Sequence, residues 1–220
     1  SNKHGYLSQM QIAIMPVTPL QQNCTFIWCE NTMEGVFIDP GGEVEGLLQL
    51  AQDKNVNVIK ILLTHGHIDH VGGVAEMVER LNIPVEGPHK DDKFLLDKVD
   101  VHAAKYDMGP GPRPFTPDRW LQDGDSVSFG EIQFMVRHCP GHSPGHIIFF
   151  SDAHRFAQVG DVIFRGSIGR TDLPGGNQLD LITSIKTQLL PLGDDISFIP
   201  GHGPHSTFGH ERQTNPFLVD

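Results

Sequence analysis

The sequence predicts an α+β protein in which two mixed sheets pack together and helices cover them on the outside. Two observations carry this expectation. Each half of the 220-residue chain has strand-like segments first and an amphipathic helix after them. The segment 56–63 is almost continuously apolar, which is typical of strands covered on both faces. Because no linker divides the chain, residues 10–220 are expected to form one domain, with residues 1–9 as a tag remnant or disordered leader.

The first half begins with short segments of strand type, which end at the Asp-Pro-Gly-Gly turn of residues 39–42. A helix is expected next, because apolar residues then recur at spacings of three and four. The strands are predicted at 11–17, 23–29, 35–38 and 56–63, and the helix at 43–54.

The strand at 56–63 leads directly into Thr64-His65-Gly66-His67-Ile68-Asp69-His70. Alternation along a strand can place His65 and His67 on one face, and a turn beyond them can bring Asp69 and His70 to a neighbouring position. Imidazole nitrogens with a carboxylate are ligands that zinc and iron accept. A solvated polar loop is the alternative, but four ligand-type residues at this density favour a metal site.

After this motif, apolar residues at 74, 77, 78 and 81 predict a second helix. The motif therefore lies between a strand and a helix, where open α/β sheets generally bind ligands. Further along the chain we expect a strand at 84–87, a helix at 89–101 and an exposed loop at 108–114.

The second half is expected to contain a hairpin about Gly130, followed by more strands and a late helix. The hairpin strands are predicted at 126–129 and 132–138, the later strands at 146–150, 156–159 and 196–199, and the helix at 179–190. Three of these strands lead into a glycine and then His142, Asp161 or His202. One such loop is ordinary, but three with a histidine or aspartate at the tip indicate that the metal site is completed here.

Composition excludes several classes of function. A net charge of −11 argues against a nucleic-acid surface, which needs a clustered basic face. No apolar run approaches the ~20 residues that span a bilayer, so no membrane partner is expected. The three cysteines match no disulfide framework, which favours a reducing cytoplasm.

Taken together, the motifs resemble the metal signature of the metallo-β-lactamase superfamily, and the resemblance covers residues 10–220. Within that superfamily the chain is most similar to short, single-domain type II glyoxalases, the bacterial hydroxyacylglutathione hydrolases. The similarity rests on segments 64–67, 139–142 and 198–204. It implies a four-layer αββα sandwich, the metallo-β-lactamase fold.

The resemblance also implies a site that holds two divalent metal ions per chain, with zinc expected and iron or manganese as alternatives. One ion would be held by His65, His67 and His142, the other by Asp69, His70 and His202, with Asp161 bridging both. Asp69 and Asp161 would be the catalytic residues.

The implied reaction is hydrolysis of S-lactoylglutathione, a glutathione thioester, to D-lactate and glutathione by a metal-bridging hydroxide. The protein would be a monomer or small homo-oligomer. His70 directly after Asp69 departs from the true β-lactamases, which disfavours antibiotic hydrolysis.

Several roles stay open at this point. Asp39 either orients a ligand imidazole or simply forms a turn, and His146 is expected to support the site rather than to bind metal. Arg165 and Arg170 are candidate contacts to substrate, although for Arg170 we favour a structural pair with an acidic neighbour. Because the segment 169–172 resembles one in persulfide dioxygenases, an iron-dependent persulfide dioxygenase is an alternative function. A hydrolase of other esters or lactones is another.

Overall fold

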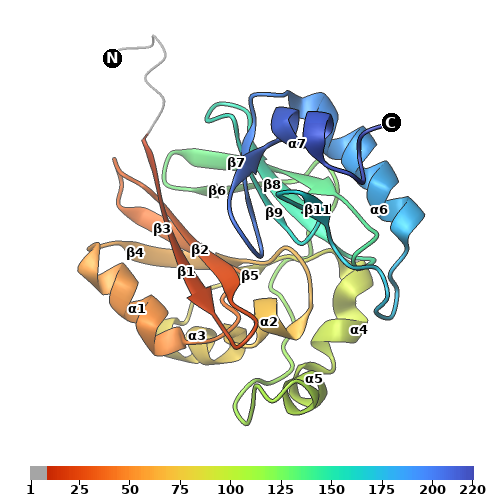
Figure 1. The fold of residues 1–220 in the computed structure, drawn as a ribbon. Coiled ribbons are helices and arrows are strands. Elements are labelled where there is room, and N and C mark those ends of the chain that lie inside the picture. Colours follow the sequence, from red (N-terminus) through yellow and green to blue (C-terminus); the bar gives the residue numbers. More distant parts are fainter. Residues whose placement is uncertain (1–8) are drawn as a thin grey trace.

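The computed structural model describes residues 9–220, so the leader expected at residues 1–9 lies almost wholly outside the described part of the chain. Two mixed sheets face each other, with helices on the outer side of each (Figure 1). The predicted four-layer α+β architecture is confirmed.

The first sheet has five strands in the order β1-β2-β3-β4-β5. The pairs β1–β2 and β2–β3 are antiparallel, whereas β3–β4 and β4–β5 are parallel. The strands are β1 Met10–Val17, β2 Gln22–Cys29, β3 Glu34–Ile38, β4 Asn57–Leu62 and β5 Val85–Glu86.

The second sheet has six strands in the order β13-β12-β9-β8-β7-β6. Its one parallel pair is β9–β12. The strands are β6 Ser126–Phe129, β7 Ile132–His138, β8 Ile147–Ser151, β9 Phe156–Gly160, β12 Ser197–Pro200 and β13 Ser206–Thr207, and β10 Ile163–Phe164 with β11 Ser167–Ile168 forms a separate small hairpin.

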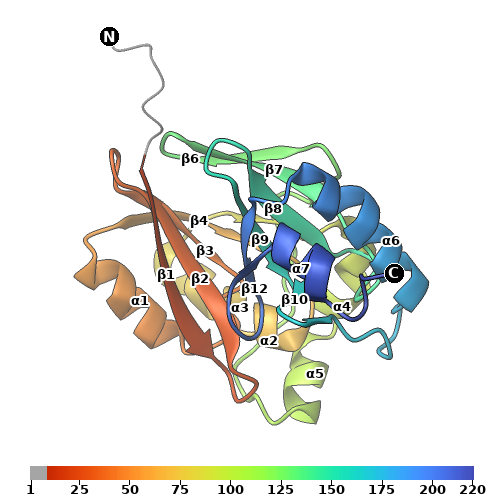
Figure 2. The same ribbon diagram turned by 45° about the horizontal axis from the view of Figure 1, so that its top comes forward.

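Three layers of apolar side chains hold the sandwich together. One lies between the first sheet and its helices and contains Leu47 and Met77. A second lies between the sheets and includes Ile38 and Phe149. A third packs α6 (Gln178–Ser184) and α7 (Phe208–Thr214) on the second sheet through Leu181 and Phe208 (Figure 2).

The other helices lie nearer the start of the chain. They are α1 Val44–Asp53, α2 Ile68–Val71, α3 Val74–Leu81, α4 Lys93–Leu96 and α5 Val99–Lys105.

Three details differ from the expectations. The helix predicted at 89–101 is broken into a 3₁₀ turn, Lys90–Asp92, and the short helices α4 and α5, because the Asp92 side chain is bound to two other loops. The late helix changes after Ser184 into a π-helical turn, Ile185–Leu189, and then a 3₁₀ turn, Leu190–Leu192. Strand β4 is fully buried only at its end, since Lys60 instead reaches Glu86 at 2.6 Å.

Strand register brings the loops that matter to one edge. In the parallel pair β3–β4, Ile38 lies opposite Leu62, so the loops after both strands start side by side. In the parallel pair β9–β12, Gly160 lies opposite Pro200, so Asp161 and Gly201 leave the second sheet at the same level. The carboxyl ends of strands from both sheets therefore surround one site.

Candidate metal centre

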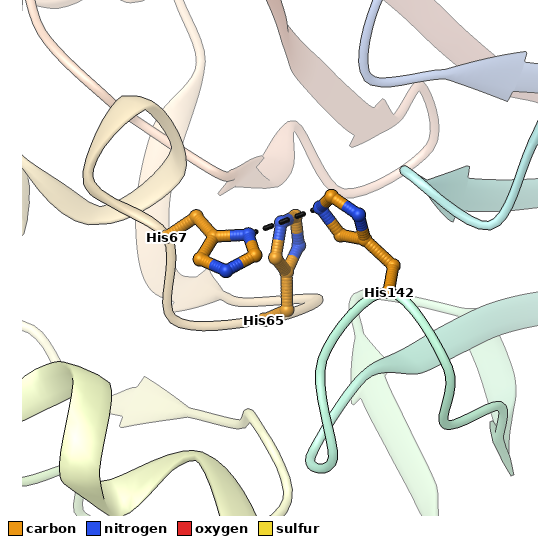
Figure 3. Close-up of side chains that lie close together, drawn as sticks. All are labelled: His65, His67 and His142. Carbon is orange, nitrogen blue, oxygen red and sulfur yellow. Dashed lines mark hydrogen bonds between the residues drawn. The ribbon is translucent and has the colours of Figure 1, made fainter. Parts of the chain in front are cut away.

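Seven ligand-type side chains meet at this edge in two groups. Within each group the potential ligand atoms all lie within 4.8 Å of one another. Figure 3 shows three rings of the first group pointing toward one another, with His65 and His67 on one loop and His142 on another. The first group is His65, His67 and His142, and the second is Asp69, His70, Asp161 and His202.

One carboxylate oxygen lies between the two groups. Asp161 Oδ2 is 3.1 Å from His70 Nε2 and 3.6 Å from His202 Nε2, both in the second group. The same oxygen is 3.4 Å from His142 Nε2 and 3.7 Å from His65 Nε2, both in the first group. Asp161 is therefore placed to interact with whatever either group binds.

Local backbone structure explains how one short motif serves both groups. The extended residue His67 caps the helical turn α2, which begins at Ile68. This change of direction sends Asp69 and His70 toward the second group. Opposite them, a Cβ at Gly201 would lie 2.1 Å from Asp161 Oδ1, so only glycine allows this approach.

Asp39 supports one histidine of each group. Its Oδ2 accepts hydrogen bonds from His70 Nδ1 (2.8 Å) and from the Thr64 hydroxyl (2.6 Å). Because the single hydroxyl proton goes to Asp39, Thr64 Oγ1 accepts the bond from His65 Nδ1 at 2.9 Å. When neutral, His65 and His70 therefore both direct an Nε2 lone pair into the site.

The histidines of the 139–146 loop are fixed in a similar way. His142 Nδ1 donates to the Arg170 carbonyl at 2.6 Å, so its Nε2 carries the lone pair, which points into the site and accepts a hydrogen bond from His67 Nδ1 at 3.0 Å (Figure 3). His146 lies outside both groups: its Nε2 accepts the Asp161 amide at 3.0 Å, and its ring stacks on His65 with centroids 4.3 Å apart. His146 thus holds the backbone of one candidate ligand and the ring of another.

The electrostatics of the two groups differ. Burial lowers the pKa of His65 well below its ordinary value and the pKa of His67 to about 3, so both rings are neutral. Burial would also lower the pKa of His70 and His202, but nearby carboxylates outweigh it. They raise the pKa of His70 well above its ordinary value and that of His202 to about 9.

These residues fit a divalent cation. His65 Nε2 and Asp161 Oδ1 are buried, and neither has a hydrogen-bond partner in the described part of the chain. Buried lone pairs without a donor are costly, and a cation would satisfy them. Nitrogen-rich groups with carboxylate oxygen are ligand sets of zinc, iron and manganese.

Several supporting residues carry no sequence signal of their own. Gln22 Nε2 donates to the carbonyl oxygens of Asp39 (2.9 Å) and Asp69 (2.8 Å), tying together the loops after β3 and β4. The sequence likewise predicted no supporting role for Thr64 or Asp92. Their roles depend on contacts between loops distant in sequence, which no motif spacing reveals.

The two candidate substrate arginines lie in different surroundings. The Arg170 guanidinium forms a two-bond ion pair with Asp172, at 2.7 and 2.8 Å, on an exposed surface. Arg165 lies in the exposed turn between β10 and β11. Within residues 9–220 its guanidinium has neither a hydrogen bond nor an ion pair. Of the two, Arg165 is free to bind an anion.

Two other features lie apart from the centre. His89, Asp91 and His138 form a smaller group of ligand-type residues, but His89 Nδ1 accepts the Asp91 amide and His138 Nε2 donates to the Pro144 carbonyl. A cavity of about 280 Å³ lies under the 108–112 loop, and none of the seven candidate ligands lines it.

Residues 17–211 match the family model described as metallo-beta-lactamase superfamily. The chain belongs to the metallo-β-lactamase superfamily. A relative from Haemophilus influenzae, named hydroxyacylglutathione hydrolase GloC, is 44% identical over 210 residues, which are 95% of this chain and 98% of that protein. The resemblance found in the sequence is therefore confirmed.

Two solved structures share the fold closely. TTHA1623, crystallised in a di-iron-bound form, has a TM-score of 0.85 and 42% identity over 94% of this chain and 100% of that one. The BLEG-1 B3 metallo-β-lactamase has a TM-score of 0.87 and 34% identity over 96% of this chain and 100% of that one. Across residues 9–220, no helix of this superfamily member is long and apolar enough to cross a membrane.

Proposed function

We propose that this protein is a hydroxyacylglutathione hydrolase that cleaves S-lactoylglutathione with a pair of divalent cations. The observation that carries the proposal is the position of Asp161 Oδ2, which faces histidines of both ligand groups. The substrate class follows the relative named hydroxyacylglutathione hydrolase GloC, which matches nearly the whole chain.

In this proposal the ligands divide as the two groups do. His65, His67 and His142 would hold one cation and Asp69, His70 and His202 the other, and Asp161 would serve both groups. Zinc is our first assignment, with iron or manganese as alternatives, since all three accept this donor set. The di-iron form of TTHA1623 supports iron as the main alternative. All ligands belong to one domain, residues 10–220.

The chemistry that such cations supply when bound is activation of water at neutral pH and polarisation of the acyl carbonyl. The chain's own residues must orient the water and accept its proton. Burial would raise the pKa of Asp69, but His70 and a hydrogen bond from His202 lower it. With cations bound these histidines would be neutral, and the positive charge of the cations would then keep the Asp69 carboxylate ionised. Asp69 is our candidate for accepting that proton. Water adds to the acyl carbon, the carbon–sulfur bond breaks, and the glutathione thiolate leaves.

The substrate approaches from the side of His202. The His202 side chain is 31% exposed, whereas those of His65 and His142 are 0% and 4% exposed. The centroids of the Phe164 and His202 rings lie 6.1 Å apart, so an apolar ring lies beside this partly exposed histidine. Arg165 follows Phe164 directly, so its free guanidinium is our candidate for binding a glutathione carboxylate.

The substrate is a small molecule, and the compartment we propose is the cytoplasm. All three cysteines are buried and unpaired, which is consistent with a reducing environment.

Two other functions have a specific observation behind them. BLEG-1, described as a B3 metallo-β-lactamase, shares 34% identity, so β-lactam hydrolysis must be tested even though the Asp69-His70 order argued against it. The segment Gly169–Asp172 keeps the persulfide dioxygenase alternative open.

A parallel assay distinguishes these functions. One preparation of known metal content is given S-lactoylglutathione, glutathione persulfide and a β-lactam such as nitrocefin, with thioester loss, oxygen uptake and ring opening followed. We expect thioester hydrolysis to have the highest kcat/KM. Oxygen uptake with persulfide and no thioester hydrolysis would overturn the proposal, as would ring opening faster than thioester cleavage.

A further inference from the structure

Asp92 is a fully buried carboxylate that lies outside both ligand groups. It is 0% exposed, and it follows β5 in the 3₁₀ turn Lys90–Asp92. Its carboxylate accepts three hydrogen bonds, which come from Gly66 N (2.9 Å), Ser143 Oγ (2.8 Å) and Gly145 N (2.6 Å). Every partner is a donor, so the ionised carboxylate satisfies them all.

These donors flank the candidate ligands of the first group. Gly66 lies between His65 and His67, while Ser143 follows His142 directly. The Oδ2 atom of Asp92 binds one donor from each loop, and Oδ1 adds Gly145 from the second. A third element therefore joins the two loops that form the first group.

Both loops carry a glycine where this element approaches. A Cβ at Gly145 would lie 2.5 Å from Asp92 N and 2.7 Å from Asp92 Cγ. A Cβ at Gly66 would lie 2.9 Å from Leu95 Cβ, just beyond the same turn. His89 N also donates to the Gly145 carbonyl at 3.1 Å, so both the amide and the carbonyl of Gly145 are hydrogen-bonded to this segment. The close fit leaves little freedom in the spacing of the two loops.

We propose that Asp92 is a positioning residue that sets the distance between the His65–His67 loop and His142, and thereby determines cation affinity at the first group. The inference rests on the ligand assignment of the proposed function. The second group is held by other contacts, including those of Asp39 and Gln22. Loss of Asp92 should therefore weaken one site and spare the other.

The substitution Asp92→Asn tests this with little change in volume. The asparagine amide nitrogen is a donor, so it cannot replace a carboxylate oxygen that accepts from an amide. Metal-stripped wild type and variant are titrated with Co²⁺ and followed by visible absorption, with His142→Ala and His202→Ala as reference spectra for loss of each site. We expect about 10- to 100-fold weaker Co²⁺ binding at the site that His142→Ala abolishes, and unchanged binding at the other.

Glu211→Gln is the matched control. Glu211 is also 0% exposed, and its carboxylate also accepts an amide (Gly166 N, 2.7 Å), a hydroxyl (Ser206) and a side-chain amide (Asn215), away from the first group. Glu211→Gln should lower the melting temperature about as much as Asp92→Asn does, but it should bind Co²⁺ normally at both sites. If Asp92 has only a structural role, Asp92→Asn should also lower the melting temperature and keep normal Co²⁺ binding at both sites. That outcome overturns the proposal.

Ser143→Ala covers the case in which Asp92→Asn does not fold, because it removes one of the three hydrogen bonds and keeps the carboxylate. Weaker Co²⁺ binding at the first group alone supports the proposal, and wild-type binding at both sites contradicts it. Thioester turnover is not used as a readout, so a different natural substrate would leave this inference standing. Wild-type protein that binds no Co²⁺ would overturn both.

Discussion

Thr64 is bound to Asp39 by two hydrogen bonds, from its amide to Oδ1 at 2.8 Å and from its hydroxyl to Oδ2 at 2.6 Å. The hydroxyl thereby becomes an acceptor for His65 Nδ1. Through this relay one carboxylate orients His65 in the first group as well as His70 in the second. Fixing the tautomer of a ligand histidine in this way increases its basicity toward a metal.

Thr64→Val should weaken cation binding at the first group by about 10- to 100-fold, because valine keeps the shape of threonine and removes the hydroxyl. Competition with a chelator measures the affinity of each equivalent. Thr25→Val is the control, since the buried Thr25 hydroxyl accepts a bond from Gln158 Nε2 at 2.7 Å and belongs to neither ligand group. Either variant should lose about 1–3 kcal/mol of stability. Equal metal affinity in the two variants would exclude the relay.

Metal loading at the second group should depend strongly on pH. Carboxylates raise the pKa of His70 well above its ordinary value and that of His202 to about 9, so both rings are protonated in the metal-free protein at neutral pH. Each must release a proton before it binds a metal, so affinity should rise about tenfold per pH unit per proton between pH 7 and 9. His65 and His67 are already neutral, so the affinity for metal at the first group should change less with pH. Calorimetry in buffers of different ionisation enthalpy counts the protons; release of none would contradict this.

The same shift affects the stability of the metal-free protein. Protonated His202 lies beside Asp69 and Asp161, so its stabilising contribution is complete below its ordinary pKa of 6.5 and is lost as the pH rises through about 9. The melting temperature of metal-free wild type should therefore fall between pH 6.5 and 9 by more than that of His202→Gln. Parallel melting curves for the two proteins would argue against a charged His202.

Gly201→Ala should impair metal binding with little change at the surface. The new methyl group would lie 2.1 Å from Asp161 Oδ1 and 2.8 Å from His70 Cε1, so the carboxylate must move. Overpacking of this kind costs about 1–3 kcal/mol, and we expect at least a tenfold loss in affinity at the second group. At Gly42 the nearest neighbour is the Thr18 methyl at 3.3 Å, and Gly42→Ala should bind metal normally. If Gly201→Ala and Gly42→Ala both bind metal normally, the close approach of Gly201 to Asp161 would be refuted.

Arg165→Ala and Arg170→Ala should separate in steady-state kinetics. A hydrogen bond to a charged group contributes about 1.5–3 kcal/mol, so loss of the free Arg165 should raise KM for S-lactoylglutathione about tenfold or more at unchanged kcat. Arg170 is already paired with Asp172, and the bond to His142 uses its backbone carbonyl, which alanine keeps. Arg170→Ala should change KM by less than Arg165→Ala and leave metal content unchanged. The reverse order would move the anion site to Arg170.

The sequence predicted the sandwich well because strand and helix periodicities are local and the metal motifs follow strand ends. The hairpin about Gly130, expected at 126–129 and 132–138, has those bounds in the structure. The prediction of one continuous helix at 89–101 was wrong, because no local pattern reveals the hydrogen bonds that Asp92 accepts from Gly66 and Gly145, which break the segment. Helix α7 and strand β13 near the chain's end were not predicted at all.

Within the site, spacing could indicate which residue types gather but not how they are supported. Nothing at Thr64 in the sequence signals a proton relay, and Gln22 is separated by 47 residues from the Asp69 carbonyl it binds. Asp39 accepts a hydrogen bond from the ring of His70, a candidate ligand, and its positive φ of 56° shows that it also forms the turn. The turn is thus observed, and the orienting role stays a prediction that depends on the ligand assignment.

The central claim, a pair of cations held by groups that share Asp161, is tested most directly by returning zinc to metal-stripped protein and following S-lactoylglutathione hydrolysis against equivalents added. The account predicts no hydrolysis without metal, full activity at two equivalents, and an Asp161→Ala variant that is inactive and never holds two ions tightly. Full hydrolysis by the stripped protein, or two tightly bound ions with wild-type activity in Asp161→Ala, would contradict it.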